Sequence, residues 1–323
     1  MKDTVNANLF FSPDIAVEIS PNARLADYTT FRLGGPCKAL ISCQTPLQLE
    51  RVIKQLADDN LPFILIGSGS NLVVSDEELD CYVVRYDSPT PLIELDGTEI
   101  QVAASTKLDD LAIFAAEHGL EGLNYTSGIP GTVGGAVVGN AGAFGKQVGD
   151  VLKSVVLIDK KGCTREAGPH ELGFTYRHSI LKETGDIVVS AKFQLQPGDR
   201  GALLTEREEI LSVRREKHPN LETHPCAGSF FRNIEPTSAA GRRQATGWFL
   251  DQAGGKKLRH GGAAIFEKHA NIIVKSDGCT AQDVLELSKK MAELIKKEFN
   301  IDLVREVRFV GRFAGQKLQS IIW

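Results

Sequence analysis

The chain has 323 residues, 42% of them hydrophobic and 24% charged, and its 37 basic and 41 acidic side chains give a net charge of −4. This balance is typical of a soluble globular protein and excludes a disordered chain. The slightly acidic charge argues against nucleic acid as the main partner. No apolar run approaches the ~20 residues of a membrane helix, and no secretory signal is visible. We therefore expect a cytoplasmic protein with no membrane partner, and the length favours more than one domain.

The cysteines and histidines give little sign of a metal site. The six cysteines contain no C-x-x-C pair and no framework of a small disulfide-rich domain. His218, His224 and Cys226 are the only close group of metal-binding side chains, and their spacing fits no zinc pattern. We therefore expect reduced thiols and no metal.

Apolar spacing and turn residues predict a mixture of helices and strands. Helices are expected over residues 46–59, 107–118, 206–216, 247–253 and 281–295. Strands are expected over residues 62–66, 72–74, 82–86, 99–103, 155–158, 187–195, 263–266, 271–274 and 307–310. Thr45, Thr106, Thr246 and Thr280 are the predicted N-caps, and Thr280 begins a capping box with Asp283. Because the elements do not alternate strictly, the pattern favours an α+β fold over a doubly wound sheet.

Two breaks divide the chain. Pro89 and Pro91 mark the first, and the sequence Pro-Gly-Asp at 197–199 marks the second. We therefore expect three parts, over residues 1–88, 89–200 and 201–323.

Two glycine-rich segments are the outstanding feature of the sequence. The first, Gly67–Asn71, follows a predicted strand, but Leu72 stands where a dinucleotide-binding turn has its third glycine. Its backbone N–H groups could instead cradle a phosphate, or the segment could be an ordinary turn. The second, Ser127–Gly145, is small and uncharged. It suits a flat, hydrogen-bonding ring system, although a tightly packed glycine/alanine crossing would look the same.

Eight short motifs in sequence order give these segments a context. They are Thr29–Gly35, Ile66–Leu72, Ser127–Gly135, Asn140–Ala143, Tyr176–Ser179, Ala227–Asn233, Glu267–Asn271 and Glu306–Arg308. With them, from about residue 22 to residue 311, the chain resembles the UDP-N-acetylenolpyruvoylglucosamine reductases. The resemblance implies an FAD-binding domain of the vanillyl-alcohol-oxidase type in two subdomains, followed by a C-terminal α+β substrate-binding domain. It also implies non-covalent FAD, NADPH as electron donor, and reduction of UDP-N-acetylglucosamine enolpyruvate to UDP-N-acetylmuramate for peptidoglycan.

The resemblance also implies roles for individual residues. Arg177 and Glu306 would stabilise the enolate, and Ser229 would donate the proton. The expected FAD-binding residues are Gly67, Ser68, Gly69, Ser70, Asn71, Ser127, Gly128, Pro130, Gly131, Thr132, Gly134, Gly135, Asn140, Ala141, Gly142 and Val188. The expected substrate-binding residues are Tyr176, Arg177, Arg214, Lys217, Phe230, Asn233 and His269.

The chain departs from the family pattern at a few positions. No tyrosine follows Tyr176, so it resembles the branch that lacks the tyrosine loop. Ile234-Glu235 and Arg305 replace more usual residues near Ser229 and Glu306. A different flavin oxidase or dehydrogenase and a non-catalytic flavin- or nucleotide-sugar-binding protein are the alternatives. The presence of all three catalytic candidates disfavours the non-catalytic alternative. The apolar tail at 314–323 has no role that the sequence defines.

Overall fold

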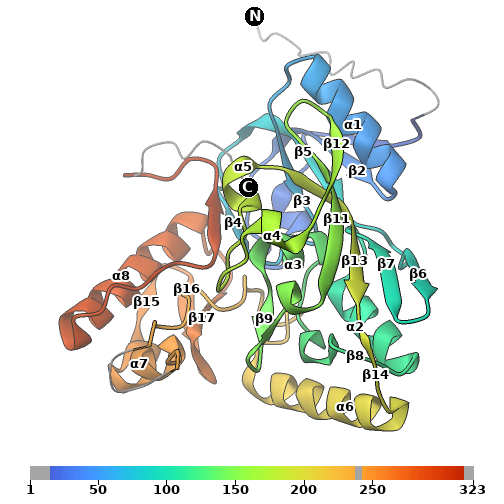
Figure 1. Ribbon diagram of the computed structural model, residues 1–323. Coiled ribbons are helices and arrows are strands. Elements are labelled where there is room, and N and C mark those ends of the chain that lie inside the picture. The colour runs from blue at the N-terminus through green and yellow to red at the C-terminus, as the bar shows by residue number, and fades with distance from the viewer. Residues whose placement is uncertain (1–14, 237–241, 316–323) are drawn as a thin grey trace, which may run out of the picture.

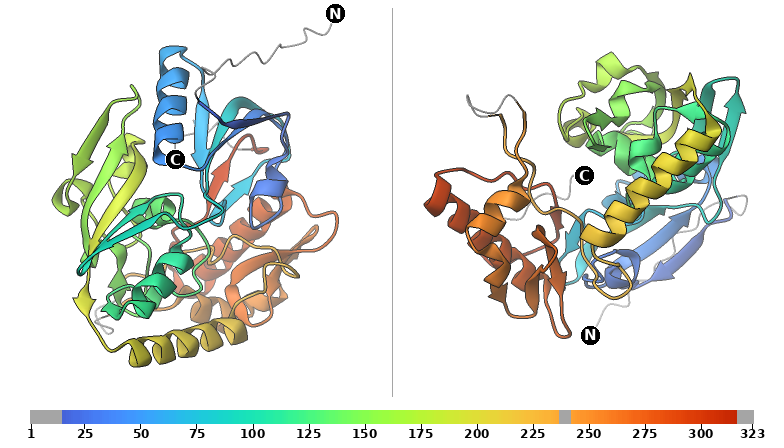
Figure 2. Two further views of the ribbon diagram at one scale, coloured as in Figure 1. Left: turned by 90° about the vertical axis from the view of Figure 1, so that its right-hand side faces the viewer. Right: turned by 90° about the horizontal axis from the view of Figure 1, so that it is seen from below.

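The computed structural model describes residues 15–236 and 242–315. The first sheet consists of β1 (Glu18–Pro21), β2 (Cys37–Cys43), β5 (Leu79–Tyr86) and β3 (Phe63–Ile66), in that order. Strand β5 pairs in parallel with β2 and β3, and β1 closes one edge in antiparallel register. Helix α1 (Pro46–Asp58) lies against this sheet (Figures 1 and 2). A short 3-10 helix, η1 (Leu25–Tyr28), connects β1 to β2.

The second sheet is antiparallel and has the order β12-β11-β13-β7-β6. Its strands are β6 (Ile93–Asp96), β7 (Glu99–Ala103), β11 (Leu152–Ile158), β12 (Thr164–Ala167) and β13 (Ile187–Gln194). Its helices are α2 (Leu108–Glu117), α3 (Val133–Gly139), α4 (Pro169–Leu172), α5 (Leu181–Thr184) and α6 (Arg200–Lys217). The small elements are β8 (Leu120–Glu121), η2 (Asn124–Thr126), β9 (Gly142–Ala143), β10 (Lys146–Gln147), η3 (Val148–Asp150) and β14 (Gln196–Pro197). Helix α6 packs along α2 and therefore lies beside this sheet (Figure 2).

The C-terminal part is a three-stranded sheet with two helices (Figure 1). Its elements are α7 (Thr246–Gln252), η4 (Gly255–Lys257), β15 (Arg259–His260), β16 (Ala263–Phe266), β17 (His269–Lys275) and α8 (Ala281–Phe299). The chain then returns to the first part, where β18 (Arg308–Val310) pairs in parallel with β4 (Leu72–Val74). This pairing places the end of the C-terminal part directly beside the first glycine-rich turn.

Two main hydrophobic cores support the described residues. The first and second sheets share one core, in which Ile41, Val84 and Val189 are at most 1% exposed. The second core surrounds α8, which the Thr280 side chain caps at the N–H of Asp283. The paired strands β4 and β18 contribute Val73 and Phe309 to the core around α8, and Val74 to a smaller core with Leu40 and Val83 of the first sheet.

Most predicted elements are confirmed by the structure. Strands β4 and β7 have the predicted bounds, α1 and α8 occupy the predicted segments, and the mixed content is that of an α+β fold. The 206–216 prediction was too short, because the Asp199 side chain accepts from the N–H of Ala202 and begins α6 at Arg200. Helix α3 inside the second glycine-rich segment was not predicted, because three of its seven residues are glycines, which have low helix propensity.

Two predicted caps were wrong. Lys107 is the N-cap of α2, whereas the Thr106 hydroxyl accepts from the N–H of Leu92. Thr246 is the first residue of α7, and its hydroxyl donates to the carbonyl of Arg232 at 2.6 Å. In both cases a contact from a distant segment competes for the hydroxyl.

The remaining features concern the cysteines, the length of the helices and the metal-binding side chains. All six cysteines are free. Over the described residues, no helix has the length and apolarity to cross a membrane, and no group of three metal-binding side chains could hold an ion. Residues 316–323, the apolar end of the tail, lie outside the described part.

Candidate active site

The turn Gly67–Asn71 connects β3 to β4 and depends on its glycines. Gly69 has a φ of +62°, and a Cβ there would lie 2.4 Å from the carbonyl oxygen of Tyr28. A Cβ at Gly67 would lie 2.5 Å from Oγ1 of Thr132. The Ser68 hydroxyl is buried, and no described group hydrogen-bonds it. The glycines of the turn therefore pack closely against Tyr28 and Thr132, where a side chain would not fit. Backbone N–H groups without side chains beside them and an unsatisfied hydroxyl are the features of an anion-binding turn.

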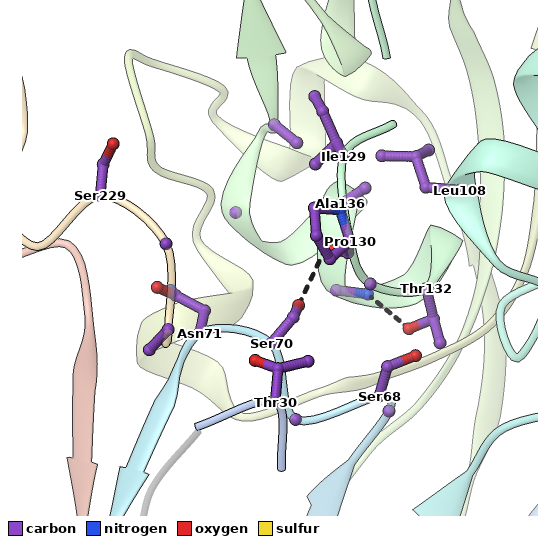
Figure 3. Close-up of a pocket in the computed structure, with 18 of the residues that line it drawn as sticks. Thr30, Ser68, Ser70, Asn71, Leu108, Ile129, Pro130, Thr132, Ala136 and Ser229 are labelled. Atoms are coloured by element: carbon purple, nitrogen blue, oxygen red, sulfur yellow. Dashed lines mark hydrogen bonds between the residues drawn. The ribbon is translucent and has the colours of Figure 1, made fainter. Parts of the chain in front are cut away.

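The second glycine-rich segment contains helix α3, and the residues that lead into this helix face the turn. Oγ1 of Thr132 accepts from the N–H of Gly135 at 3.4 Å and caps the helix. The Ser70 hydroxyl donates to the carbonyl of Pro130 at 2.9 Å and joins the two segments (Figure 3). Gly134 donates its N–H to the carbonyl of Ala104 at 2.9 Å, which fixes α3 against the end of β7. The two segments thus form one continuous wall.

A cavity of about 1010 Å³ opens beside this wall. Figure 3 shows Ser229 and Asn71 on one side of it and Pro130 with Ile129 on the other. The expected cofactor residues that line it are Gly67, Ser68, Gly69, Ser70, Asn71, Gly128, Pro130, Gly131, Thr132, Gly134, Gly135, Ala141, Gly142 and Val188. Arg177, Ser229 and Glu306, with the expected substrate residues Arg214 and Asn233, line the same cavity.

The backbone brings the three catalytic candidates together from distant parts of the chain. Glu306 donates its N–H to the carbonyl of Phe230 at 2.9 Å, so it lies beside Ser229. Nδ2 of Asn71 donates to the Glu306 carbonyl at 3.2 Å. Nε of Arg177 lies 2.9 Å from Oε1 of Glu306, and both side chains are about one-fifth exposed, at 23% and 21%. The result is a partly exposed ion pair beside a hydroxyl.

Six of the expected site residues do not line the cavity, namely Ser127, Asn140, Tyr176, Lys217, Phe230 and His269. Ser127 and Asn140 are buried at 0% and 1% exposure. Phe230 belongs to the C-terminal core, and Lys217 is exposed at the end of α6. These residues lie behind or beside the residues that line the cavity and do not line it themselves.

Tyr176 and His269 each contact a residue near the cavity. The Tyr176 hydroxyl accepts from the N–H of Asn233 at 3.3 Å, and Arg243 stacks over the Tyr176 ring at 4.0 Å. The His269 ring lies 5.3 Å from that of His218. Burial lowers the pKa of both histidines, that of His218 to about 4, so both rings are neutral at neutral pH.

The cavity holds more positive charge than the sequence predicted. Lys182, Arg215 and Arg308 line it in addition to Arg177 and Arg214. Burial lowers the pKa of Lys182 to about 8, and it also lowers the pKa values of Arg214 and Arg308. An arginine nevertheless stays charged at neutral pH, so the cavity attracts anions.

These additional residues differ in how far the sequence could have indicated them. Arg308 follows Glu306 by two residues, and both line the cavity, whereas Val307 between them is buried. This alternation is the one that an extended backbone gives. Thr30 also lines the cavity and belongs to the motif Thr29–Gly35. The sequence did not indicate that Lys182 lines the cavity, because the four-residue helix α5 is too short to show an apolar periodicity.

The comparisons with known proteins first define a class. A family model described as an FAD binding domain matches residues 37–168, which hold both glycine-rich segments. The chain is thus an FAD-binding-domain protein. A second model, the C-terminal domain of UDP-N-acetylenolpyruvoylglucosamine reductase, matches residues 219–310.

Whole-chain relatives define the family. UDP-N-acetylenolpyruvoylglucosamine reductase of Lactobacillus acidophilus is 35% identical over 296 residues, covering 92% of this chain and 96% of the relative. The protein of the same name from Carboxydothermus hydrogenoformans is 37% identical over 298 residues, covering 92% and 95%. The crystal structure of that reductase from Thermus caldophilus matches with a TM-score of 0.74 and 33% identity, covering 91% of this chain and 99% of that one. The chain belongs to the UDP-N-acetylenolpyruvoylglucosamine reductase family.

Proposed function

We propose that this chain reduces UDP-N-acetylglucosamine enolpyruvate to UDP-N-acetylmuramate, with bound FAD and with NADPH as electron donor. Such a reaction would supply a peptidoglycan precursor in the cytoplasm. The observation that carries the proposal is that Arg177, Glu306 and Ser229 line the same cavity as the two glycine-rich segments. A cofactor held by the glycine-rich wall and a substrate held by the ion pair would therefore meet.

The glycine-rich wall fits FAD. The turn Gly67–Asn71 offers bare N–H groups and the unsatisfied Ser68 hydroxyl to a diphosphate. The apolar surface from Ile129 to Ala136 suits a flat ring. Ser127 and Asn140 would act by shaping these segments, since neither lines the cavity. When bound, FAD supplies a ring that takes a hydride from NADPH and gives it to the enolpyruvyl carbon.

Arg177 and Glu306 would act on the substrate at its enolpyruvyl end. Hydride addition places negative charge on the neighbouring carbon and its carboxylate, and a guanidinium can bind both carboxylate oxygens. Arg177 is held at the cavity by its ion pair with Glu306, so its charge is already in place before the substrate enters. As a carboxylate, Glu306 would orient the guanidinium, and as the protonated acid it would donate a hydrogen bond to the enolate.

Ser229 would donate the proton that completes the reaction. A hydroxyl is a weak acid in water, and it can protonate carbon only beside a strongly basic centre in a fixed geometry. The pairing of Phe230 with Asn271 and Glu306 fixes the backbone next to Ser229. That rigidity supports its assignment as the donor.

The remaining expected substrate residues would hold the nucleotide end. Arg214 and Asn233 have the stronger support, because they line the cavity. Tyr176, Lys217, Phe230 and His269 would act through their neighbours. For the domain boundaries we propose residues 1–88, 89–200 and 201–323, with α6 as the bridge that packs back on α2.

Two measurements test the proposal. The purified protein should show flavin absorbance that survives gel filtration, and NADPH oxidation should accelerate on addition of UDP-N-acetylglucosamine enolpyruvate. Failure of the enolpyruvyl sugar to stimulate turnover of flavin-loaded protein would refute the proposed reaction. A flavin oxidase acting on another substrate would still show the absorbance but not this stimulation.

A further inference from the structure

The turn that carries Arg177 has an unusual backbone. Thr175 and His178 exchange both of their backbone hydrogen bonds, at 3.1 Å each, so Tyr176 and Arg177 are the two central residues of a tight turn. Arg177 has a φ of +57°. This left-handed conformation is disfavoured for a residue with a Cβ. The surrounding structure must therefore hold Arg177 in it.

Two side chains from outside the turn bind its carbonyl groups. Nδ2 of Asn140, at the C-cap of α3, donates to the carbonyl of Thr175 at 2.9 Å. Nζ of Lys182, from α5, donates to the carbonyl of Arg177 itself at 2.7 Å. Asn140 is also bound by Oε1 of Gln147 at 2.9 Å, so its amide cannot rotate without breaking several hydrogen bonds. The turn is thus held at both ends.

Burial of the Lys182 charge at this position is energetically unfavourable. Its pKa falls to about 8, first because of burial and then because Arg232, Arg308 and Arg177 are positively charged. The carboxylate of Glu306 acts in the opposite direction and raises the pKa. An apolar side chain would avoid the cost of burying this charge. The lysine provides instead the hydrogen bond to the Arg177 carbonyl, which an apolar side chain could not make.

We infer that Lys182 and Asn140 are positioning residues, which hold the Arg177 turn so that its guanidinium meets Glu306 inside the cavity. The inference rests on the proposed reduction, because it says how Arg177 is held for that reaction. Asn140 lies outside the cavity, so its effect must pass through the turn. Lys182 lines the cavity, and direct contact with the substrate is the competing role that the experiment must separate.

The test is a double-mutant cycle on the holoenzyme between Lys182→Met and Arg177→Met. Stopped-flow absorbance times flavin reduction by NADPH and flavin reoxidation by UDP-N-acetylglucosamine enolpyruvate separately. Lys182→Met is expected to slow reoxidation by about tenfold to hundredfold, the effect of misplacing a catalytic group by about 1 Å. In the Arg177→Met background the same change is expected to slow reoxidation by less than about twofold, because no guanidinium is left to position.

Further variants complete the design. Lys182→Arg keeps a donor and is expected to recover part of the rate. Asn140→Ala is expected to show the same dependence on Arg177. Lys160→Met, an exposed lysine after β11, is the matched control and is expected to change neither half-reaction. The urea midpoint of Lys182→Met is expected to be no lower than that of the wild type, since the variant removes a buried charge.

The outcomes are distinct. Equal slowing by Lys182→Met in both backgrounds would overturn the inference and make Lys182 a substrate contact. A lower urea midpoint with proportional loss of flavin would overturn it in favour of a structural role. If the enolpyruvyl sugar does not reoxidise the flavin of the wild-type protein, the proposed function is refuted. If it does, and Lys182→Met slows reoxidation equally with and without Arg177, only the inference about Lys182 is refuted.

Discussion

Gly67 and Thr132 bring the two glycine-rich segments into contact, and Gly67→Ala would separate them. The new Cβ would lie 2.5 Å from Oγ1 and 3.0 Å from Cγ2 of Thr132. Gly67 is not in the left-handed region, so alanine adds no backbone strain there. Overpacking of this kind costs about 1–3 kcal/mol, and the lower chain entropy of alanine returns about 0.4–1 kcal/mol. We therefore expect a net loss of about 1–2 kcal/mol and weaker FAD binding.

Urea unfolding of the flavin-free protein followed by circular dichroism would measure this loss, and FAD titration would measure binding. Thr132→Ala removes both close atoms and its own cap, at a cost of about 1 kcal/mol. The double variant Gly67→Ala/Thr132→Ala should therefore be little worse than Thr132→Ala alone. Gly139→Ala, whose Cβ would meet nothing within 4 Å, is the control and should lose no stability. Additive costs in the double variant would refute the steric reasoning.

Three other changes have defined outcomes. Ser229→Ala should slow flavin reoxidation by about 10²–10⁴-fold and flavin reduction far less, and equal slowing in stopped-flow traces would contradict a proton donor. Asp109→Asn should lower the free energy of unfolding by about 1.5–3 kcal/mol in urea titrations, because the Arg207 guanidinium, whose side chain is 10% exposed, loses a bidentate carboxylate that is itself 39% exposed. A loss below ~1 kcal/mol would show that solvent screens the pair. The Lys182 pKa near 8 lies below the ordinary lysine value of 10.5, so the destabilising effect of burying its charge is complete below pH 8 and disappears by about pH 10.5. The free energy of unfolding of the wild type should therefore rise by about 3 kcal/mol relative to that of Lys182→Met between those pH values, and parallel stability curves would contradict the shift.

Local signals in the sequence predicted local structure well. The Thr280 capping box and the apolar spacing of α8 were sufficient, because both act within a few residues. Thr106 and Thr246 failed as caps because Leu92 and Arg232, distant in the sequence, compete for their hydroxyls. Helix α3 was hidden because its stability comes from the close approach of Gly134 to Ala104 rather than from helix propensity.

The candidate site could be predicted from sequence only in part. The motifs named the glycine-rich wall and the three catalytic candidates, and most of these residues line one cavity. They did not reveal that Asn140 binds Thr175 or that Lys182 binds the Arg177 carbonyl, because these contacts arise only when separate elements pack. A motif identifies which residues are present, and the fold determines which of them support the others.

The parallel pairing of β18 with β4 has a consequence for biosynthesis. Arg308 pairs with Leu72, so a strand made early in translation receives its partner only after 236 further residues have been added. Such a long-range contact forms slowly in folding. A nascent chain that stops short of Glu306 would contain the whole glycine-rich wall and Arg177 and could bind flavin, yet it would lack the carboxylate that pairs with Arg177 at the cavity. Flavin loading during synthesis could therefore precede the appearance of a working enzyme, and a truncated product would be coloured and inactive.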